Sequence, residues 1–196
     1  MKTVLFVPGY PENINSRDYS STMDAIRSAG FAVEYVPINW RRTTLDQWVT
    51  ELDTMYSRYD PSNTIIAGFS FGAMTALVAS TKRNPYELWL FSLSPYFAED
   101  LVSKNMRPSW LKQIGRRRVD VFKKYSFKKL ADQIRCKVLL FGGQAEMAKW
   151  PGMNDRIISA SELLQDNVLI TIPDTGHDVA DRNYINAIRA NISCKD

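Results

Sequence analysis

The chain has few of the residues from which metal sites and disulfide frameworks are built. It contains one histidine and two cysteines, and Cys136 and Cys194 stand in no metal-ligand spacing. A zinc site made of histidine and cysteine ligands is therefore not expected, and both thiols are expected to be reduced. We predict that the protein uses no cofactor and no metal.

Long apolar stretches are also missing. The longest apolar runs, such as residues 4–7 and 138–141, have the length of strands and are far too short to span a membrane. The first run follows Met1-Lys2-Thr3 and ends at Pro8, so it is too short for the core of a signal peptide. Low-complexity tracts and internal repeats are absent from the sequence. These absences predict a single cytoplasmic domain over residues 1–196, with no membrane partner.

Strand-like and helix-like patterns alternate along the chain. Short apolar runs fit strands buried on both faces, and apolar residues at helical spacing fit the segments between them. The predicted strands are residues 4–7, 31–38, 63–67, 88–93, 137–141 and 168–172. The predicted helices are residues 20–29, 44–56, 71–81, 155–164 and 181–192, with short helices between 95 and 133. This alternation predicts an α/β protein with a mostly parallel six-stranded sheet and helices on both faces.

A nucleophile motif follows the third predicted strand. Gly68-Phe69-Ser70-Phe71-Gly72 has the pattern G-x-S-x-G, and it opens a helix, as the nucleophile elbow requires. The tight turn strains the serine backbone, and the glycines leave room where a Cβ would collide with neighbouring backbone. We predict that Ser70 is a nucleophile, although a glycine-rich turn with a capping serine would show the same pattern.

The base and the acid are expected after later strands. A serine hydroxyl needs a base, and His177, the one histidine, follows the last predicted strand. Glu146 follows the fifth strand, where a carboxylate can hold one imidazole tautomer, and Asp155 is the alternative acid. Asp174 and Asp178 are too near His177 in sequence to reach its far ring nitrogen.

An oxyanion hole needs two backbone N–H groups that point at one place. Phe71, directly after the nucleophile, supplies one of them. Tyr10, in the loop after the first strand, supplies the other if the strand order reverses between the first and third strands. A rigid turn over residues 8–11 is the alternative interpretation.

The elbow, Gly143 before Glu146, the Gly176-His177 step and the strand spacing together resemble the α/β-hydrolase superfamily. The resemblance covers nearly the whole chain and implies the strand order 2-1-3-4-5-6, without the two antiparallel strands that usually open the fold. The acid is Glu where this superfamily more often has Asp. The helical insertion at about 95–134 is too short for a full cap domain, so a minimal lid is implied.

Four residues are candidates for substrate binding, because they follow strands at the edge where ligands bind in such sheets. They are Tyr96, Phe97, Met147 and Trp150. Their side chains are able to line an acyl or aromatic pocket. An equal alternative for Trp150 is that it covers the edge of the sheet.

Positive charge is concentrated in one segment. Residues 95–137 contain 12 Lys or Arg against 4 Asp or Glu, a net charge of +8, whereas the whole chain carries +4. The segment has no nucleic-acid motif, so its charges are expected on solvated helix faces. If it borders the site, its field would attract anionic substrates, an effect that salt screens.

These features predict a serine hydrolase that cleaves carboxylic esters, short-chain ones in the absence of a large lid, or thioesters through an acyl-enzyme. The expected partner is a small-molecule substrate and not a nucleic acid. The alternatives are a serine peptidase or amidase, which uses the same triad, and a ligand-binding module that retains the hydrolase fold.

Overall fold

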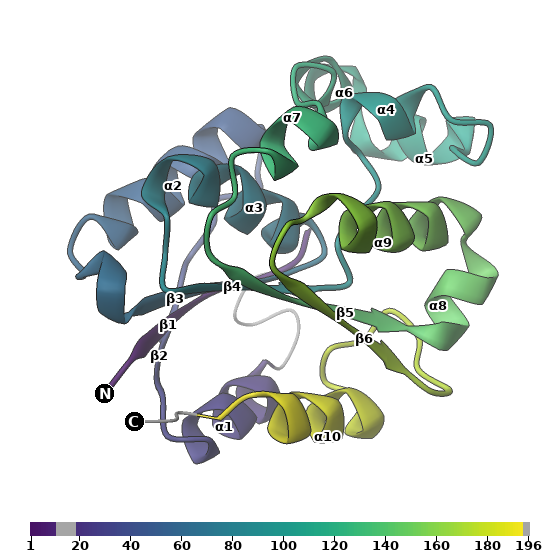
Figure 1. The fold of residues 1–196 in the computed structure, drawn as a ribbon. Helices are drawn as coiled ribbons and strands as arrows, with labels where there is room; N and C mark the ends of the chain where they lie inside the picture. Colours follow the sequence, from purple (N-terminus) through teal and green to yellow (C-terminus); the bar gives the residue numbers. More distant parts are fainter. Residues whose placement is uncertain (11–18, 194–196) are drawn as a thin grey trace.

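Six parallel strands form a single sheet. The computed structural model describes residues 1–10 and 19–193. The strands lie in the order β2-β1-β3-β4-β5-β6, and every neighbouring pair is parallel (Figure 1). They are β1 (Thr3–Val7), β2 (Ala32–Tyr35), β3 (Thr64–Phe69), β4 (Glu87–Phe91), β5 (Lys137–Gly143) and β6 (Asn167–Ile172). The predicted strand order and fold class are confirmed.

Helices cover both faces of this sheet. The long helices are α1 (Ser20–Ser28), α2 (Leu45–Tyr56), α3 (Phe71–Arg83), α9 (Pro151–Leu163) and α10 (Arg182–Asn191), and a 3-10 turn, η1, spans Pro61–Asn63. The short helices are α4 (Ala98–Leu101), α5 (Pro108–Ile114), α6 (Arg116–Phe122), α7 (Phe127–Ala131) and α8 (Gln144–Lys149). Figure 1 shows α1 and α10 on one face and α2, α3 and α9 on the other.

The apolar runs form two cores because successive strand residues point to opposite faces. Leu5 and Val7 belong to the core under α2 and α3, whereas Val4 and Phe6 belong to the core over α1 and α10. The four inner strands therefore need apolar residues at nearly every position. The edge strands β2 and β6 are largely half-buried and carry more mixed sequences.

Some predicted boundaries differ from the structure. The second strand is shorter than residues 31–38: it spans Ala32–Tyr35, followed by a hydrogen bond from the Val36 N–H to Phe6 O. The helix expected at 155–164 starts at Pro151, a residue suited to the first helical turn. Helix α8 was not expected. It is held from outside, since the N–H groups of Ala145 and Glu146 both donate to Thr175 O.

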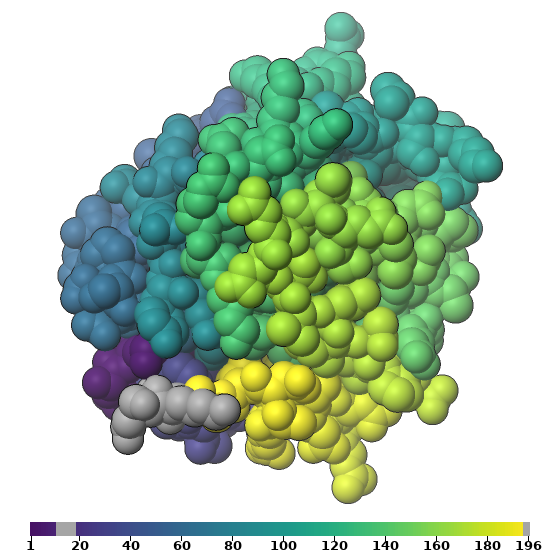
Figure 2. All heavy atoms as spheres, viewed as in Figure 1, coloured from purple at the N-terminus to yellow at the C-terminus, as the bar shows by residue number. Residues whose placement is uncertain are grey.

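The insertion between β4 and β5 lies over one end of the molecule. Helices α4 to α7 form it, and in the space-filling view this teal and green segment occupies the top of the molecule above α9 (Figure 2). A buried ion pair fastens it to α9: Arg156 Nη2 lies 2.5 Å from Asp100 Oδ1, with side chains 4% and 10% exposed. The Arg156 guanidinium also lies over the ring of Phe127, 4.2 Å from its centroid.

Cys136, the residue before β5, is buried and free. Burial raises the pKa of its thiol to about 11, so the thiol stays protonated at neutral pH. Cys194 lies outside the described residues. Within residues 1–10 and 19–193, none of the helices has the length and apolar character needed to cross a membrane.

The Asp100–Arg156 pair predicts an asymmetric mutational effect. Arg156→Met leaves the Asp100 carboxylate buried without its counter-charge and should reduce the free energy of unfolding by about 3 kcal/mol. Adding Asp100→Asn removes the unpaired charge and keeps an acceptor for the Phe97 N–H. The free energy of unfolding of the double variant should therefore fall by less than that of Arg156→Met. Urea unfolding of both variants measures this. A double variant no more stable than Arg156→Met would contradict it.

Candidate active site

Ser70 occupies a strained turn between β3 and α3. Its backbone has φ 57° and ψ −117°, a conformation that costs a residue with a side chain about 1–3 kcal/mol. The turn packs tightly on the end of β1, because a Cβ on Gly72 would lie 2.3 Å from both Val7 O and Pro8 O. The missing side chain at residue 72 therefore allows α3 to begin directly against β1.

The structure brings the three predicted catalytic residues together. Ser70 Oγ lies 3.0 Å from His177 Nε2, and His177 Nδ1 lies 2.7 Å from Glu146 Oε2. The serine follows β3, the glutamate lies in the first turn of α8 after β5, and the histidine lies in the loop after β6. The rings of Phe69 and Trp150 flank the imidazole at centroid distances of 4.8 and 5.6 Å. The imidazole is thus held between a hydroxyl and a carboxylate.

The Glu146 carboxylate is fully buried, with 0% of its side chain exposed. Its Oε1 accepts hydrogen bonds from Ser92 Oγ at 2.6 Å and from the Gly143 N–H at 2.9 Å. Ser92 Oγ also lies 3.1 Å from the hydroxyl of Tyr184. Burial, and then the Glu146 charge, raise the pKa of Tyr184 well above its ordinary value, so its hydroxyl keeps its proton. These polar partners offset the cost of removing the carboxylate from water.

The loop that carries His177 is fixed against the start of α8. A Cβ on Gly143 would lie 2.3 Å from Thr175 O, so only glycine allows this approach. The same carbonyl accepts the N–H groups of Ala145 and Glu146 at 3.0 and 3.2 Å. The positions of the acid and the histidine are therefore set by one shared contact.

The alternative acid lies elsewhere. Asp155, on α9, accepts a hydrogen bond of 2.5 Å from Asn105 Nδ2 at the exposed surface. The carboxylate in contact with His177 is that of Glu146. The structure therefore favours the first of the two sequence-based choices.

A cavity of about 220 Å³ opens above Ser70. Its walls come from the elbow, the loop after β4, the insertion and α9. They are formed by Ser70, Phe71, Ser94, Pro95, Tyr96, Trp110, Gln113, Trp150, Met153 and His177. Burial raises the pKa of Tyr96 to about 12, so its phenol is neutral at physiological pH.

Two of the four predicted binding residues, Tyr96 and Trp150, line this cavity, and two do not. Phe97 is fully buried below it, with its ring 5.2 Å from that of Phe127. Met147 lies in α8 and lines a separate pocket beside Pro151. Phe97 and Met147 lie outside this cavity because adjacent residues in a helix or turn point in different directions, which the strand order alone does not define.

Sequence reasoning missed several residues of the site. Ser94 Oγ lies 3.1 Å from Ser70 Oγ, and Ser92 contacts Glu146. Ser92 directly follows the carboxyl end of β4 and Ser94 lies two residues further on, so their position after a strand was a usable signal. Trp110 and Gln113 come from α5, and no pattern in the sequence indicates that the insertion brings this helix over Ser70.

The loops after β1 and β3 are neighbours, as the oxyanion prediction requires. Val7 pairs with Gly68, so both loops leave the sheet side by side. The Phe71 N–H belongs to the first turn of α3, where backbone donors have no partner within the helix. The Tyr10 ring packs edge-on against Phe71 at 5.6 Å, and its hydroxyl accepts a hydrogen bond of 3.0 Å from Arg118 Nη1. Pro11, the last residue of the predicted turn, lies outside the described residues.

Metal-ligating groups are scattered. Within the described residues, no three histidine, cysteine, aspartate or glutamate side chains come close enough to hold a metal ion. The polar groups in contact at the site are a serine hydroxyl, an imidazole and a carboxylate.

Comparisons with known proteins identify the fold. No family model matches the sequence, and no curated protein matches it. The structure is similar to Est1E from Butyrivibrio proteoclasticus, with a TM-score of 0.76 and 16% identity over 96% of this chain and 86% of that chain. Est1E has also been solved with ferulic acid bound.

Two further solved structures are similar to this chain. Mouse alpha/beta hydrolase domain-containing protein 10 has a TM-score of 0.66 and 16% identity, covering 96% of this chain and 86% of that one. A carboxylesterase of the thaumarchaeon Nitrososphaera gargenis has a TM-score of 0.64 and 13% identity, covering 91% and 84%. The chain has the α/β-hydrolase fold, as the sequence motifs suggested.

The Ser92 contact predicts a graded loss of reactivity at Ser70. Ser92→Ala leaves Glu146 Oε1 with the Gly143 N–H as its donor, so the carboxylate should be held less firmly and His177 oriented less well. Labelling of Ser70 by a fluorophosphonate should slow about tenfold, by analogy with the loss seen when a hydrogen bond that orients a metal ligand is removed. An unchanged labelling rate in a correctly folded variant would rule out this positioning role.

Proposed function

We propose that the protein is a serine hydrolase that cleaves carboxylic esters or thioesters through an acyl-enzyme on Ser70. The observation that carries the proposal is the continuous hydrogen-bonded chain from Ser70 Oγ through His177 to the buried Glu146, opening into a cavity. A nucleophile in contact with a base, itself oriented by a third group, is the arrangement that nucleophilic catalysis needs.

In the first half-reaction, Ser70 Oγ attacks the carbonyl carbon of the substrate while His177 Nε2 takes its proton. The resulting oxyanion is stabilised by the N–H groups of Phe71 and Tyr10. The tetrahedral intermediate collapses, His177 returns the proton to the departing alcohol or thiol, and the acyl group stays on the serine. In the second half, His177 Nε2 takes a proton from a water molecule as that water attacks the acyl carbon. The second tetrahedral intermediate then collapses, His177 returns the proton to Ser70 Oγ, and a carboxylic acid leaves.

Glu146 acts through His177 in this scheme. The carboxylate faces Nδ1, so it holds the tautomer with the proton on that nitrogen and leaves Nε2 free to accept the serine proton. It also stabilises the imidazolium that forms after proton transfer. Full burial strengthens this interaction, because water does not screen it.

The cavity supports a small acyl group. Its volume of about 220 Å³ lies below the usual range of ligand pockets, roughly 300–1,000 Å³. Phe71, Tyr96, Trp110 and Trp150 supply aromatic walls. Est1E, which has the same fold, binds ferulic acid, a small aromatic acid, so short aliphatic and compact aromatic acyl groups are the candidates here.

The proposed triad predicts three severe variants and one neutral control. Ser70→Ala and His177→Ala should each abolish hydrolysis of p-nitrophenyl acetate, and the double variant should be hardly worse, because the residues act as a unit. Glu146→Gln should lower kcat by 10²-fold or more. Asp155→Asn should retain full activity, since Asp155 lies at the surface.

These variants also distinguish the alternatives. Activity that survives Ser70→Ala would exclude the acyl-enzyme mechanism. A wild-type protein that cleaves the matched p-nitroanilide faster than the ester would indicate an amidase. One that binds esters without turnover would indicate a ligand-binding module.

The cavity predicts a preference for short acyl chains. Across p-nitrophenyl esters, kcat/KM should be highest for acetate to butyrate and fall at least tenfold by octanoate, because the longer chain does not fit in the space above Ser70. Met153→Ala enlarges one wall and should move the optimum to longer chains. Faster hydrolysis of octanoate than of acetate by the wild-type protein would contradict this.

A further inference from the structure

A second pocket, rich in arginine, lies beside the catalytic cavity. It has a volume of about 370 Å³ and lies between the turn before α2 and the start of α6. Its lining residues are Arg42, Thr43, Ile114, Gly115, Arg116, Arg117 and Arg118. We call it the arginine pocket. The proposed ester hydrolysis on Ser70 does not use it.

The pocket is held in shape by hydrogen bonds from its own arginines. Arg118 donates to Trp40 O at 2.6 Å and to Thr43 O at 3.0 Å, and Arg117 donates to Arg42 O at 3.0 Å. Arg42 has φ 56°, a strained conformation that these bonds to the turn maintain. The expectation that this segment is simply a solvated helix face is therefore wrong for Arg118, which is half-buried and bonded to backbone carbonyls.

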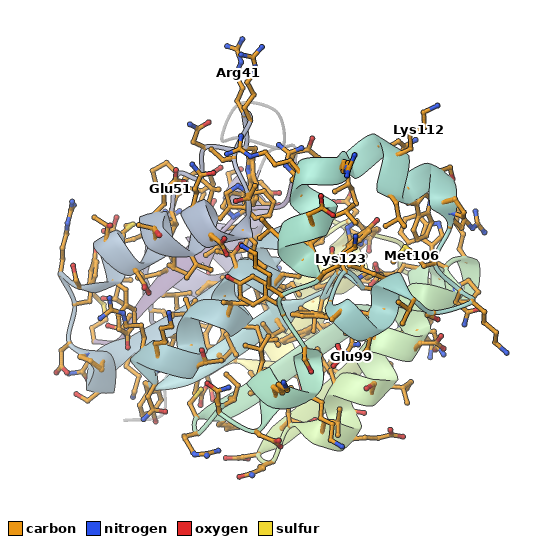
Figure 3. The ribbon with its side chains drawn as sticks, turned by 90° about the horizontal axis from the view of Figure 1, so that it is seen from above. Arg41, Glu51, Glu99, Met106, Lys112 and Lys123 are labelled. Carbon is orange, nitrogen blue, oxygen red and sulfur yellow. The ribbon has the colours of Figure 1, made fainter. Side chains whose placement is uncertain are left out.

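The positive charge of the pocket is poorly neutralised. Among the described residues, its arginines have one carboxylate partner, Asp120, which lies 3.7 Å from the Nε of a 95% exposed Arg116. Exposed pairs of this kind contribute little. Figure 3 shows Arg41 and Lys112 extending away from the body of the molecule on this side, so neighbouring residues add positive charge. Arg42, Arg116 and Arg117 are exposed, whereas Arg118 is engaged by backbone carbonyls and Tyr10. Guanidinium groups pair with phosphate oxygens through two parallel hydrogen bonds, so a phosphate group is the ligand that suits the three exposed arginines.

The arginine pocket and the catalytic cavity are joined through Tyr10. The Tyr10 hydroxyl bonds to Arg118, and its ring packs against Phe71, which lines the catalytic cavity. Gln113 and Ile114 are consecutive residues, and one lines each space. An extended molecule that lies across Tyr10 therefore reaches both.

We propose that the arginine pocket binds a phosphate-bearing part of the substrate, on the leaving-group side of the bond that Ser70 attacks. This inference rests on the proposed function and narrows its substrate class to phosphorylated esters or thioesters. The acyl group lies in the smaller catalytic cavity, and the leaving alcohol or thiol extends over Tyr10 to the phosphate site. Hydrolysis then yields a carboxylic acid and a phosphorylated alcohol or thiol.

Two thioesters with the same acyl group test this. Acetyl coenzyme A carries phosphate groups on its thiol portion, and S-acetyl-N-acetylcysteamine is the neutral, truncated counterpart. The wild-type protein should prefer the phosphorylated substrate at least tenfold in kcat/KM. The double variant Arg42→Gln/Arg117→Gln should reduce that preference at least fivefold, through KM rather than kcat.

The matched control removes two positive charges, as the test variant does, but at positions outside the arginine pocket. Lys128 and Lys129 are exposed on α7 and do not line the arginine pocket. Lys128→Gln/Lys129→Gln should keep both the preference and the rate with the neutral thioester. An equal loss of preference in the two double variants would show a long-range field instead of a binding site and would overturn the proposal. So would a wild-type protein without preference.

Direct binding separates this inference from the proposed hydrolysis. In the Ser70→Ala background, calorimetry should show coenzyme A binding that weakens at least fivefold on adding Arg42→Gln/Arg117→Gln. This binding result, together with a wild-type protein that hydrolyses neither thioester, would support the phosphate site and reject the proposed hydrolysis. Pyrophosphate is the second probe. If it binds as tightly as coenzyme A and accelerates hydrolysis of the neutral thioester, the arginine pocket is an effector site, and the proposal that it binds part of the substrate is overturned.

Discussion

The buried carboxylate of Glu146 is the constraint on which the end of the sheet depends. A charge with no exposed surface is stable only if donors surround it, and here they come from three different elements: Ser92 after β4, Gly143 at the end of β5, and His177 after β6. Each of these elements is fixed by the sheet register. The geometry of the contact between Ser70 Oγ and His177 Nε2 therefore depends on the donors that surround this one carboxylate.

The insertion is attached to the rest of the molecule by two arginines that act in different ways. Arg156 pairs with a carboxylate, Asp100, in a buried site, whereas Arg118 is bonded mainly to backbone carbonyls and to Tyr10. The first holds α4 against α9, and the second holds α6 against the loops after β1 and β2. Between these attachments the insertion supplies Trp110 and Gln113 to the cavity, so a segment of short helices shapes the site.

Much of the fold and part of the site were predictable from local sequence. The apolar runs gave the strands because both faces of the inner strands are buried, and the G-x-S-x-G turn located Ser70 because few residues tolerate its backbone. Helix α8 was missed, since its first N–H groups are held by Thr175 O, which belongs to a loop distant in the sequence. Phe97 and Met147 were misplaced because position after a strand does not set side-chain direction.

The sequence by itself determined the class of the fold, the strand order that its resemblance implied, and the identity of Ser70, His177 and Glu146 as candidates. These depend on periodicity, on local turn chemistry and on the presence of one histidine. Only the tertiary structure decided that Glu146 rather than Asp155 contacts His177, that Ser92 and Ser94 join the site, and that arginines far apart in the chain line one pocket. The physical reason is that these contacts join residues of different loops, whose relative positions are set by strand register and helix packing, not by neighbours in sequence.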